Sequence, residues 1–158
     1  MMTDDQTLQE GDVAPDIHLV DDQGDDFRLE KLKGKNVVLY FYPKADTPGC
    51  TKESCEFRDN SAKFTAQDTV IVGVSPDKSG AQSKFKTKFD LPFTLLADKD
   101  HATAAAYGVW KEKSMYGKKY MGIERTTFLI GKDGRIRKIF SKVKPEGHAE
   151  EVFQALTV

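Results

Sequence analysis

The 158-residue sequence is poor in long apolar runs, histidine and cysteine. Its longest apolar stretch, residues 37–42, is far shorter than the ~18 residues that a membrane span needs, which excludes a transmembrane helix. The amino terminus is acidic and polar and lacks the basic and apolar regions of a secretory signal. Because 39% of the residues are apolar, disordered and low-complexity classes are excluded as well. These absences favour a cytoplasmic globular protein with no membrane partner.

The charge and the length of the chain bear on its partners and its number of domains. The 24 Lys and Arg residues nearly balance the 25 Asp and Glu residues. The lysines are spread along the chain rather than clustered with aromatic residues, so we expect no nucleic-acid partner. The length suits one domain, and no repeat or linker interrupts it. We therefore predict a single domain over residues 1–158, with about the first ten residues disordered.

Hydrophobic periodicity predicts the elements of the amino-terminal half. Two short apolar segments flank a Gly-containing turn and predict a β-hairpin, residues 17–20 and 27–29. Two unbroken apolar runs, 36–42 and 69–74, are typical of strands buried on both faces. The stretch between them, 50–66, has the spacing of an amphipathic helix.

The carboxyl-terminal half alternates between helices and strands. Helical spacing predicts helices at residues 79–89, 100–107 and 145–156. Strands are predicted at residues 93–96, about 120–130 and 135–140, the last two joined by an Asp-Gly turn. This order predicts an α/β protein with a thioredoxin-like fold, in which helices flank a central mixed β-sheet.

The only two cysteines, Cys50 and Cys55, occur in a chain large enough to fold without a disulfide. Cys50 follows Pro48 and Gly49 at the junction of a predicted buried strand and a predicted helix. Free backbone N–H groups and the positive end of the helix dipole meet there, and both favour a thiolate over a thiol. We therefore predict that Cys50 is a nucleophile; the alternative is a small buried apolar residue.

Cys55 lies five residues later, within the predicted helix. Ideal helix geometry separates Cα atoms at this spacing by about 8.6 Å, whereas a disulfide needs less than about 7 Å. Bonding of an oxidised Cys50 to Cys55 therefore requires the helix to unwind locally. In another interpretation Cys55 only packs in the core.

A zinc site is a further interpretation of two cysteines. It is disfavoured because the three histidines are far apart in the sequence and form no H-x3–5-H pair. The absence of a C-x-x-C motif also disfavours a simple dithiol reductase. We expect no metal site.

Residues 43–50 read P-x3-T-x2-C, which resembles the active-site signature of the peroxiredoxins. Residues 51–59 resemble the peroxiredoxin Q, or bacterioferritin comigratory protein, subfamily. Further stretches match that subfamily: residues 73–77, 107–110, 116–118, 121–130 and 147–152. The resemblance covers nearly the whole chain from about Gly11 onward.

The resemblance implies roles for five residues. Cys50 is implied to be the peroxidatic cysteine and Cys55 the resolving cysteine, while Pro43, Thr47 and Arg125 complete the peroxide-binding site. The implied activity is reduction of hydrogen peroxide and organic hydroperoxides through a Cys50 sulfenic acid and an intramolecular disulfide. Thioredoxin or a similar dithiol protein is the implied reductant. No cofactor is implied, and the subfamily suggests a monomer.

The residues alone leave other interpretations open. Thr47 could only cap the helix, Pro43 could only end the strand, and Arg125 could be a surface charge. On the same fold, a protein of another class could use the disulfide as a switch. That alternative is a peroxide-sensing or chaperone-like binding protein.

Overall fold

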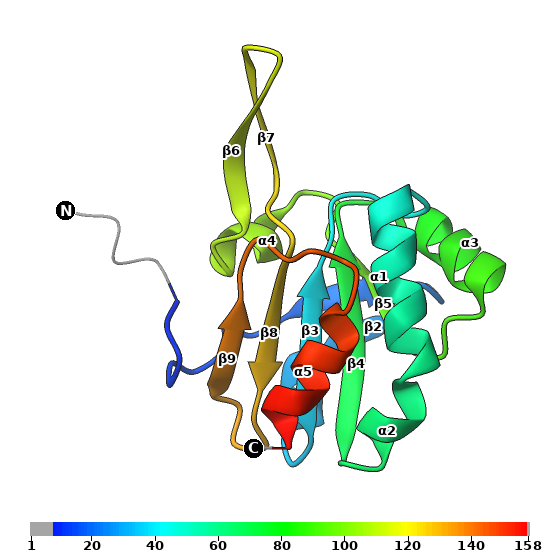
Figure 1. The fold of residues 1–158 in the computed structure, drawn as a ribbon, viewed down its shortest axis with the longest axis vertical. Coiled ribbons are helices and arrows are strands. Elements are labelled where there is room, and N and C mark those ends of the chain that lie inside the picture. The colour runs from blue at the N-terminus through cyan, green and yellow to red at the C-terminus, as the bar shows by residue number, and fades with distance from the viewer. Residues whose placement is uncertain (1–7, 158) are drawn as a thin grey trace.

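A computed structural model describes residues 8–157, and within them seven strands form one mixed sheet in the order β2-β1-β5-β4-β3-β8-β9 (Figure 1). The strands are β1 (His18–Asp21), β2 (Asp26–Arg28), β3 (Asn36–Phe41), β4 (Thr69–Ser75), β5 (Thr94–Ala97), β8 (Thr126–Ile130) and β9 (Ile136–Phe140). The helices are the 3-10 turn η2 (Leu29–Leu32), α1 (Pro48–Asp59), α2 (Ser61–Thr65), α3 (Ser79–Phe89), α4 (Ala102–Ala106) and α5 (His148–Leu156). The predicted thioredoxin-like fold with a mixed central sheet is confirmed.

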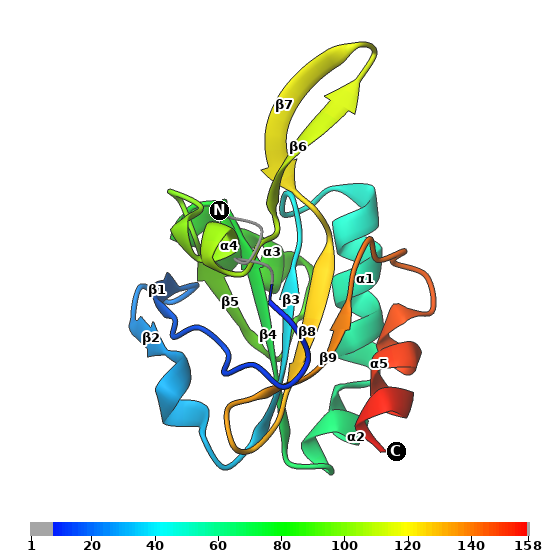
Figure 2. The same cartoon turned by 90° about the vertical axis from the view of Figure 1, so that its left-hand side faces the viewer.

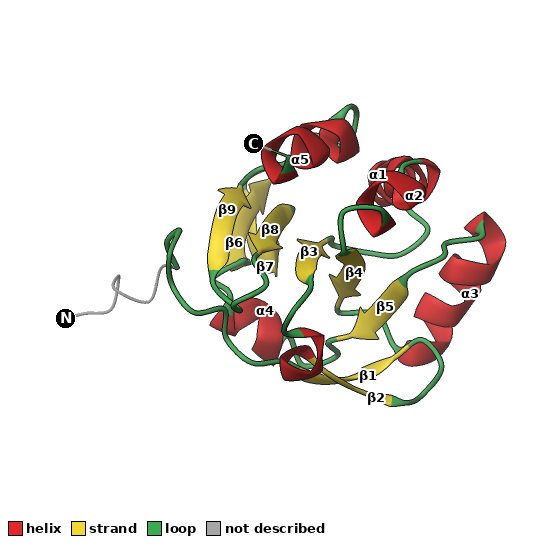
Figure 3. Cartoon of the chain, turned by 90° about the horizontal axis from the view of Figure 1, so that it is seen from below, coloured by secondary structure: helices red, strands yellow, loops and turns green. Residues whose placement is uncertain are grey.

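Strand β3 lies inside the sheet, parallel to its neighbour β4 and antiparallel to its neighbour β8. Its side chains alternate between two apolar clusters: Val37 and Leu39 belong to one, and Val38 and Tyr40 to the other. Figure 3 shows α1, α3 and α5 on one face of the sheet and α4 on the other. Burial on both faces explains why this segment reads as an unbroken apolar run.

The amino-terminal hairpin is confirmed, with Leu19 of β1 opposite Phe27 of β2. Helix α3 has the predicted bounds, Ser79–Phe89. The predicted disorder of about residues 1–10 lies, for residues 1–7, outside the described residues. Leu8, by contrast, packs against the core.

The single helix predicted over residues 50–66 is wrong, because the chain forms two helices that meet at Asn60. Asn60 has a non-helical ψ of 4°, and its side-chain amide donates a hydrogen bond to the carbonyl of Glu56 at 2.8 Å. Asn side chains compete with the backbone for such hydrogen bonds, which disfavours the helix interior. Helix α1 therefore ends one turn beyond Cys55.

The strand predicted over about 120–130 is also wrong. Its first part is β7 (Lys118–Ile123), which pairs with β6 (Trp110–Met115) in a separate two-stranded hairpin, and its second part is β8. Tyr116 and Gly117 both have positive φ, as a tight two-residue turn requires. Figure 2 shows this hairpin projecting from the end of the molecule at which α1 begins.

Candidate active site

Cys50 lies in the first turn of α1, which follows the loop at the carboxyl end of the buried strand β3. Thr47 is the residue before the helix, and Pro48 occupies its first position, where a missing N–H costs nothing. The Cys50 side chain is 1% exposed and packs in the same cluster as Tyr40 and Tyr42. The junction therefore holds the sulfur at the positive end of a helix dipole, shielded from bulk water.

Arg125 lies between β7 and β8 and points at the sulfur. Its Nη2 donates to Cys50 Sγ at 3.4 Å, and its Nη1 donates to Glu53 Oε1 at 2.8 Å. The side chain is only 16% exposed, so the surface-charge interpretation of Arg125 does not fit the structure. A guanidinium in this position stabilises negative charge on the sulfur. It also has further N–H groups that can donate hydrogen bonds to a molecule that the sulfur attacks.

Glu53 is a site residue that the sequence analysis missed. It lies one turn after Cys50 with a fully buried side chain, and its only charged hydrogen-bond partner among the described residues is Arg125. Its second oxygen, Oε2, is buried without a partner in residues 8–157. Burial raises the pKa of Glu53 from 4.5 to about 7, although Arg125 lowers it. Glu53 therefore fixes the direction of the guanidinium.

This raised pKa predicts a pH-dependent stability. The folded state holds the Glu53 proton more tightly than the unfolded chain does, so the group's contribution to the free energy of unfolding falls as pH rises from about 4.5 to about 7. Relative to Glu53→Gln, the wild type should lose roughly 3 kcal/mol across that window. Urea unfolding of both proteins at the two ends of the window measures the change. A difference that stays constant with pH would contradict the prediction.

The loop before α1 is held from the neighbouring strand β4. Asp77 Oδ2 accepts hydrogen bonds from the Ala45 N–H and from the Ser75 hydroxyl, both at 2.7 Å. Asp77 lies within residues 73–77, one of the stretches that match the peroxiredoxin Q subfamily, but nothing in the sequence predicts its contact with Ala45. The bond fixes the loop that carries Thr47.

Thr47 and Pro43 frame this loop. Thr47 makes no side-chain cap to the helix; its hydroxyl donates to the carbonyl of Lys44 at 2.7 Å, so simple capping does not explain the residue. Pro43 is half-buried directly after Tyr42, whose N–H still bonds to β4. Both residues therefore lie on the short segment that leads from β3 to Cys50.

Gly49 leaves space for the guanidinium. A Cβ at this position would lie 3.0 Å from Arg125 Nη2, so Gly49→Ala must displace that group. We expect the rate of peroxide reduction to fall about ten- to a hundredfold without loss of the fold. Gly80→Ala is the matched control, because a Cβ there, also near a helix start, meets no atom within 4 Å. Equal rates for the two variants in stopped-flow oxidation would refute this role of Gly49.

Cys55 is half-buried in the same helix, and both cysteines are free thiols. It lines a surface hollow of about 570 Å³ together with Thr47, Thr51 and Glu56. The structure thus places both cysteines in one intact helix, at a spacing that exceeds disulfide reach by about 1.6 Å or more.

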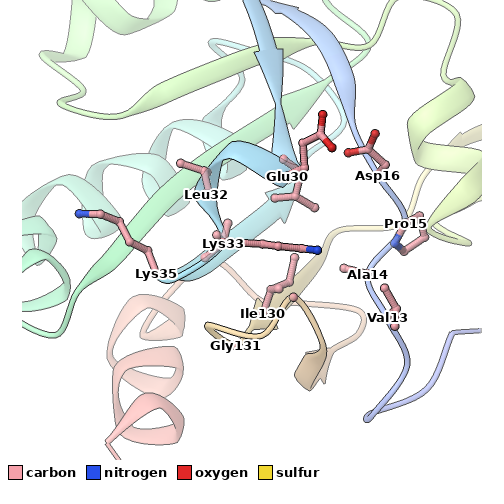
Figure 4. Close-up of a pocket in the computed structure, with 13 residues that line it drawn as sticks. Val13, Ala14, Pro15, Asp16, Glu30, Leu32, Lys33, Lys35, Ile130 and Gly131 are labelled. Atoms are coloured by element: carbon pink, nitrogen blue, oxygen red, sulfur yellow. The ribbon is translucent and has the colours of Figure 1, made fainter.

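No cluster of three or more His, Cys, Asp or Glu side chains suited to a metal ion occurs in residues 8–157. None of the helices in this range is both long enough and apolar enough to cross a bilayer. Another hollow, of about 410 Å³, is lined by Val37 and Ile130 (Figure 4). It lies at the end of β3 opposite to Cys50 and takes no part in the site.

Comparison with known proteins identifies the family of the chain. The AhpC/TSA family model matches residues 11–139. Peroxiredoxin Bcp of Bacillus subtilis is 52% identical over 150 residues, covering 95% of this chain and 96% of that protein. Peroxiredoxin Bcp of Escherichia coli is 43% identical over 149 residues, covering 94% and 96%. A structure of Xanthomonas campestris peroxiredoxin Q superposes with a TM-score of 0.86 at 40% identity, covering 89% of this chain and 90% of the other.

The family model spans most of the chain, and the relatives match it along nearly their whole length. The fold, the cysteine at the helix start and the arginine beside it are arranged as the sequence resemblance implied. The chain therefore belongs to the AhpC/TSA family and, within it, to the peroxiredoxin Q group of peroxiredoxins.

Proposed function

We propose that this protein reduces hydrogen peroxide and organic hydroperoxides, with Cys50 as the attacking thiolate. The observation that carries the proposal is the contact of 3.4 Å between Arg125 Nη2 and the sulfur of a buried cysteine in the first turn of a helix. A related structure, that of the Xanthomonas campestris bacterioferritin comigratory protein, is described in terms of alkyl peroxide reduction, which supports this substrate class.

In the first step the Cys50 thiolate attacks the terminal oxygen of the hydroperoxide. The S–O bond forms as the O–O bond breaks, and the leaving oxygen takes up a proton to give water or an alcohol. Negative charge moves from sulfur to the leaving oxygen, so donors aimed at that path lower the barrier. Arg125 supplies such donors. The Thr47 hydroxyl donates to the Lys44 carbonyl at rest and adds to them by exchanging that hydrogen bond for one to the peroxide, and Pro43 shields the pocket from water. Cys50 is left as a sulfenic acid.

In the second step the Cys55 thiolate attacks the Cys50 sulfenic sulfur and releases water, forming an intramolecular disulfide. The intact helix keeps the two residues too far apart, so the first turns of α1 must unwind. Glu53 lies between the two cysteines in the sequence, and its buried ion pair with Arg125 resists this motion. Formation of the disulfide therefore depends on local unfolding at the start of α1.

The third step restores both thiols. A dithiol protein of the thioredoxin type attacks the disulfide, passes through a mixed disulfide, and leaves oxidised while Cys50 and Cys55 each regain a proton. Because both redox cysteines lie in one chain, the cycle needs no second subunit, and we infer a monomer. The reducing cytoplasm is the compartment in which such a cycle turns over.

Cys55→Ser tests the second step. This variant should consume about one equivalent of peroxide and then stop, because the sulfenic acid has no intramolecular partner. Dimedone labelling of Cys50, followed by mass spectrometry, detects the trapped species. Sustained thioredoxin-dependent turnover in this variant would remove Cys55 from the cycle.

Repeated turnover of the wild type also separates this function from its alternative. A peroxide-sensing switch or chaperone-like binding protein on the same fold has no need of fast catalytic cycles. Steady NADPH consumption with thioredoxin and thioredoxin reductase supports the peroxidase, whereas one oxidation event without recycling supports the switch.

A further inference from the structure

The hairpin of β6 and β7 has no role in the steps above, although it projects from the same end of the molecule at which α1 begins (Figure 2). Its residues, 110–123, include four lysines and one glutamate, a net charge of +3. The hairpin also exposes large apolar side chains: Tyr116 at its tip is 98% exposed, and Met115, Tyr120 and Met121 are exposed as well. Exposed Tyr and Met side chains with few acidic neighbours are typical of interaction surfaces.

Three of the four lysines lie on one face of the hairpin, together with exposed Met and Tyr side chains. Cross-strand pairs put Lys111 opposite Gly122, Lys113 opposite Tyr120 and Met115 opposite Lys118. Alternate residues of a strand share a face, so these three pairs lie on one side of the hairpin. We call Lys111, Lys113, Met115, Lys118 and Tyr120 the basic face.

The base of the basic face lies next to the segment that carries Arg125. At its base Lys111 Nζ binds Glu124 Oε2 at 3.0 Å, and Glu124 directly precedes Arg125. Lys113 lies over Gly122, where a Cβ would come within 3.3 Å of its Cδ. Burial and the Arg125 charge lower the pKa of Lys113, while Glu124 and, to a smaller extent, Cys50 raise it. The hairpin therefore extends the positive charge of the site outward.

Resting on the proposed function, we infer that the basic face is the docking surface for the dithiol protein that reduces the disulfide, and that this partner presents an acidic surface next to its reactive thiol. Complementary charge suits a transient redox complex, because such a complex has a small interface and forms quickly only when electrostatic attraction guides the partner to it. A flat lipid surface would contact the exposed tip of the hairpin but not the basic face along its side. A partner seated against that face reaches α1 and its cysteines.

The test compares two reductants. The double variant Lys118→Glu/Tyr120→Ser should lose at least about tenfold in kcat/KM for thioredoxin, while turnover with dithiothreitol stays at the wild-type value. Lys84→Glu, on an exposed site of α3, is the matched control and should change neither rate. The thioredoxin rate of the wild type should also fall as NaCl is raised, more steeply than that of the double variant.

Three results would overturn the inference. The double variant could retain wild-type kcat/KM for thioredoxin, or it could lose activity equally with both reductants, which would locate its defect in the site itself. It could also lose a wild-type ability to co-sediment with anionic phosphatidylglycerol vesicles at an unchanged thioredoxin rate, which would assign the hairpin to a lipid surface. Failure of the proposed function is distinct, because the wild type would then reduce peroxide with neither reductant.

Discussion

Cys50→Ser should lower the rate of hydroperoxide reduction by at least about three orders of magnitude. A serine hydroxyl is not ionised near neutral pH and cannot be oxidised to a sulfenic acid, so neither the attack nor the resolving step is possible. The fold should survive, because serine is close in size to cysteine and Arg125 can donate to its oxygen as it does to the sulfur.

Stopped-flow peroxide consumption checks this expectation. Cys55→Ser is its matched control, since the same substitution at the other cysteine should leave the first oxidation fast. A Cys50→Ser protein that consumes peroxide at the wild-type rate would show that the chemistry occurs elsewhere in the chain.

Arg125→Met should damage both catalysis and stability. Loss of the donor to Cys50 removes transition-state stabilisation and should cost about 10² to 10³ in rate. The same change leaves the Glu53 carboxylate buried without its cation, which should lower the free energy of unfolding by about 3–5 kcal/mol above pH 7. At acidic pH the loss should be smaller, because Glu53 then takes up a proton.

A second substitution separates the two effects. Arg125→Met/Glu53→Gln removes both charges and should recover much of the lost stability while the peroxide rate stays low. Urea unfolding and stopped-flow kinetics on the single and double variants complete the cycle. If the double variant recovered the rate, Arg125 would act only by neutralising Glu53 and not on the peroxide.

The central sheet was predictable because its strands have simple environments. Strand β3 is buried on both faces, which makes its sequence an unbroken apolar run. The hairpin of β6 and β7 was not predictable in the same way, since its lysines and exposed methionines face solvent and give no core pattern. The break at Asn60 was missed because it depends on one side-chain hydrogen bond.

The residues of the candidate site also differ in whether the sequence predicts them. We predicted Cys50 as a nucleophile from its place at a helix start, and we predicted Thr47 and Arg125 from the resemblance to a family. Glu53 was missed because a glutamate in an amphipathic helix normally faces water. Its burial depends on Arg125, 72 positions away in the sequence. Charges that stabilise each other across such a separation carry no local signal.

The proposed role of Cys55 as the resolving cysteine requires helix α1 to change conformation. In the reduced protein it shares an intact helix with Cys50 and has no path to the sulfur. The cycle therefore predicts a chain that changes conformation each time it turns over, with α1 as the moving element. A disulfide that is absent at rest becomes the product of oxidation.

The proposed cycle is tested most sharply by intact-mass analysis of the reduced protein after one equivalent of hydrogen peroxide. The cycle yields a monomer lighter by two hydrogen atoms, with no thiol left for an alkylating reagent and with Cys50 and Cys55 in one disulfide-linked peptide. A chain heavier by one oxygen atom with Cys55 still open to alkylation, or a disulfide between two chains, would contradict it.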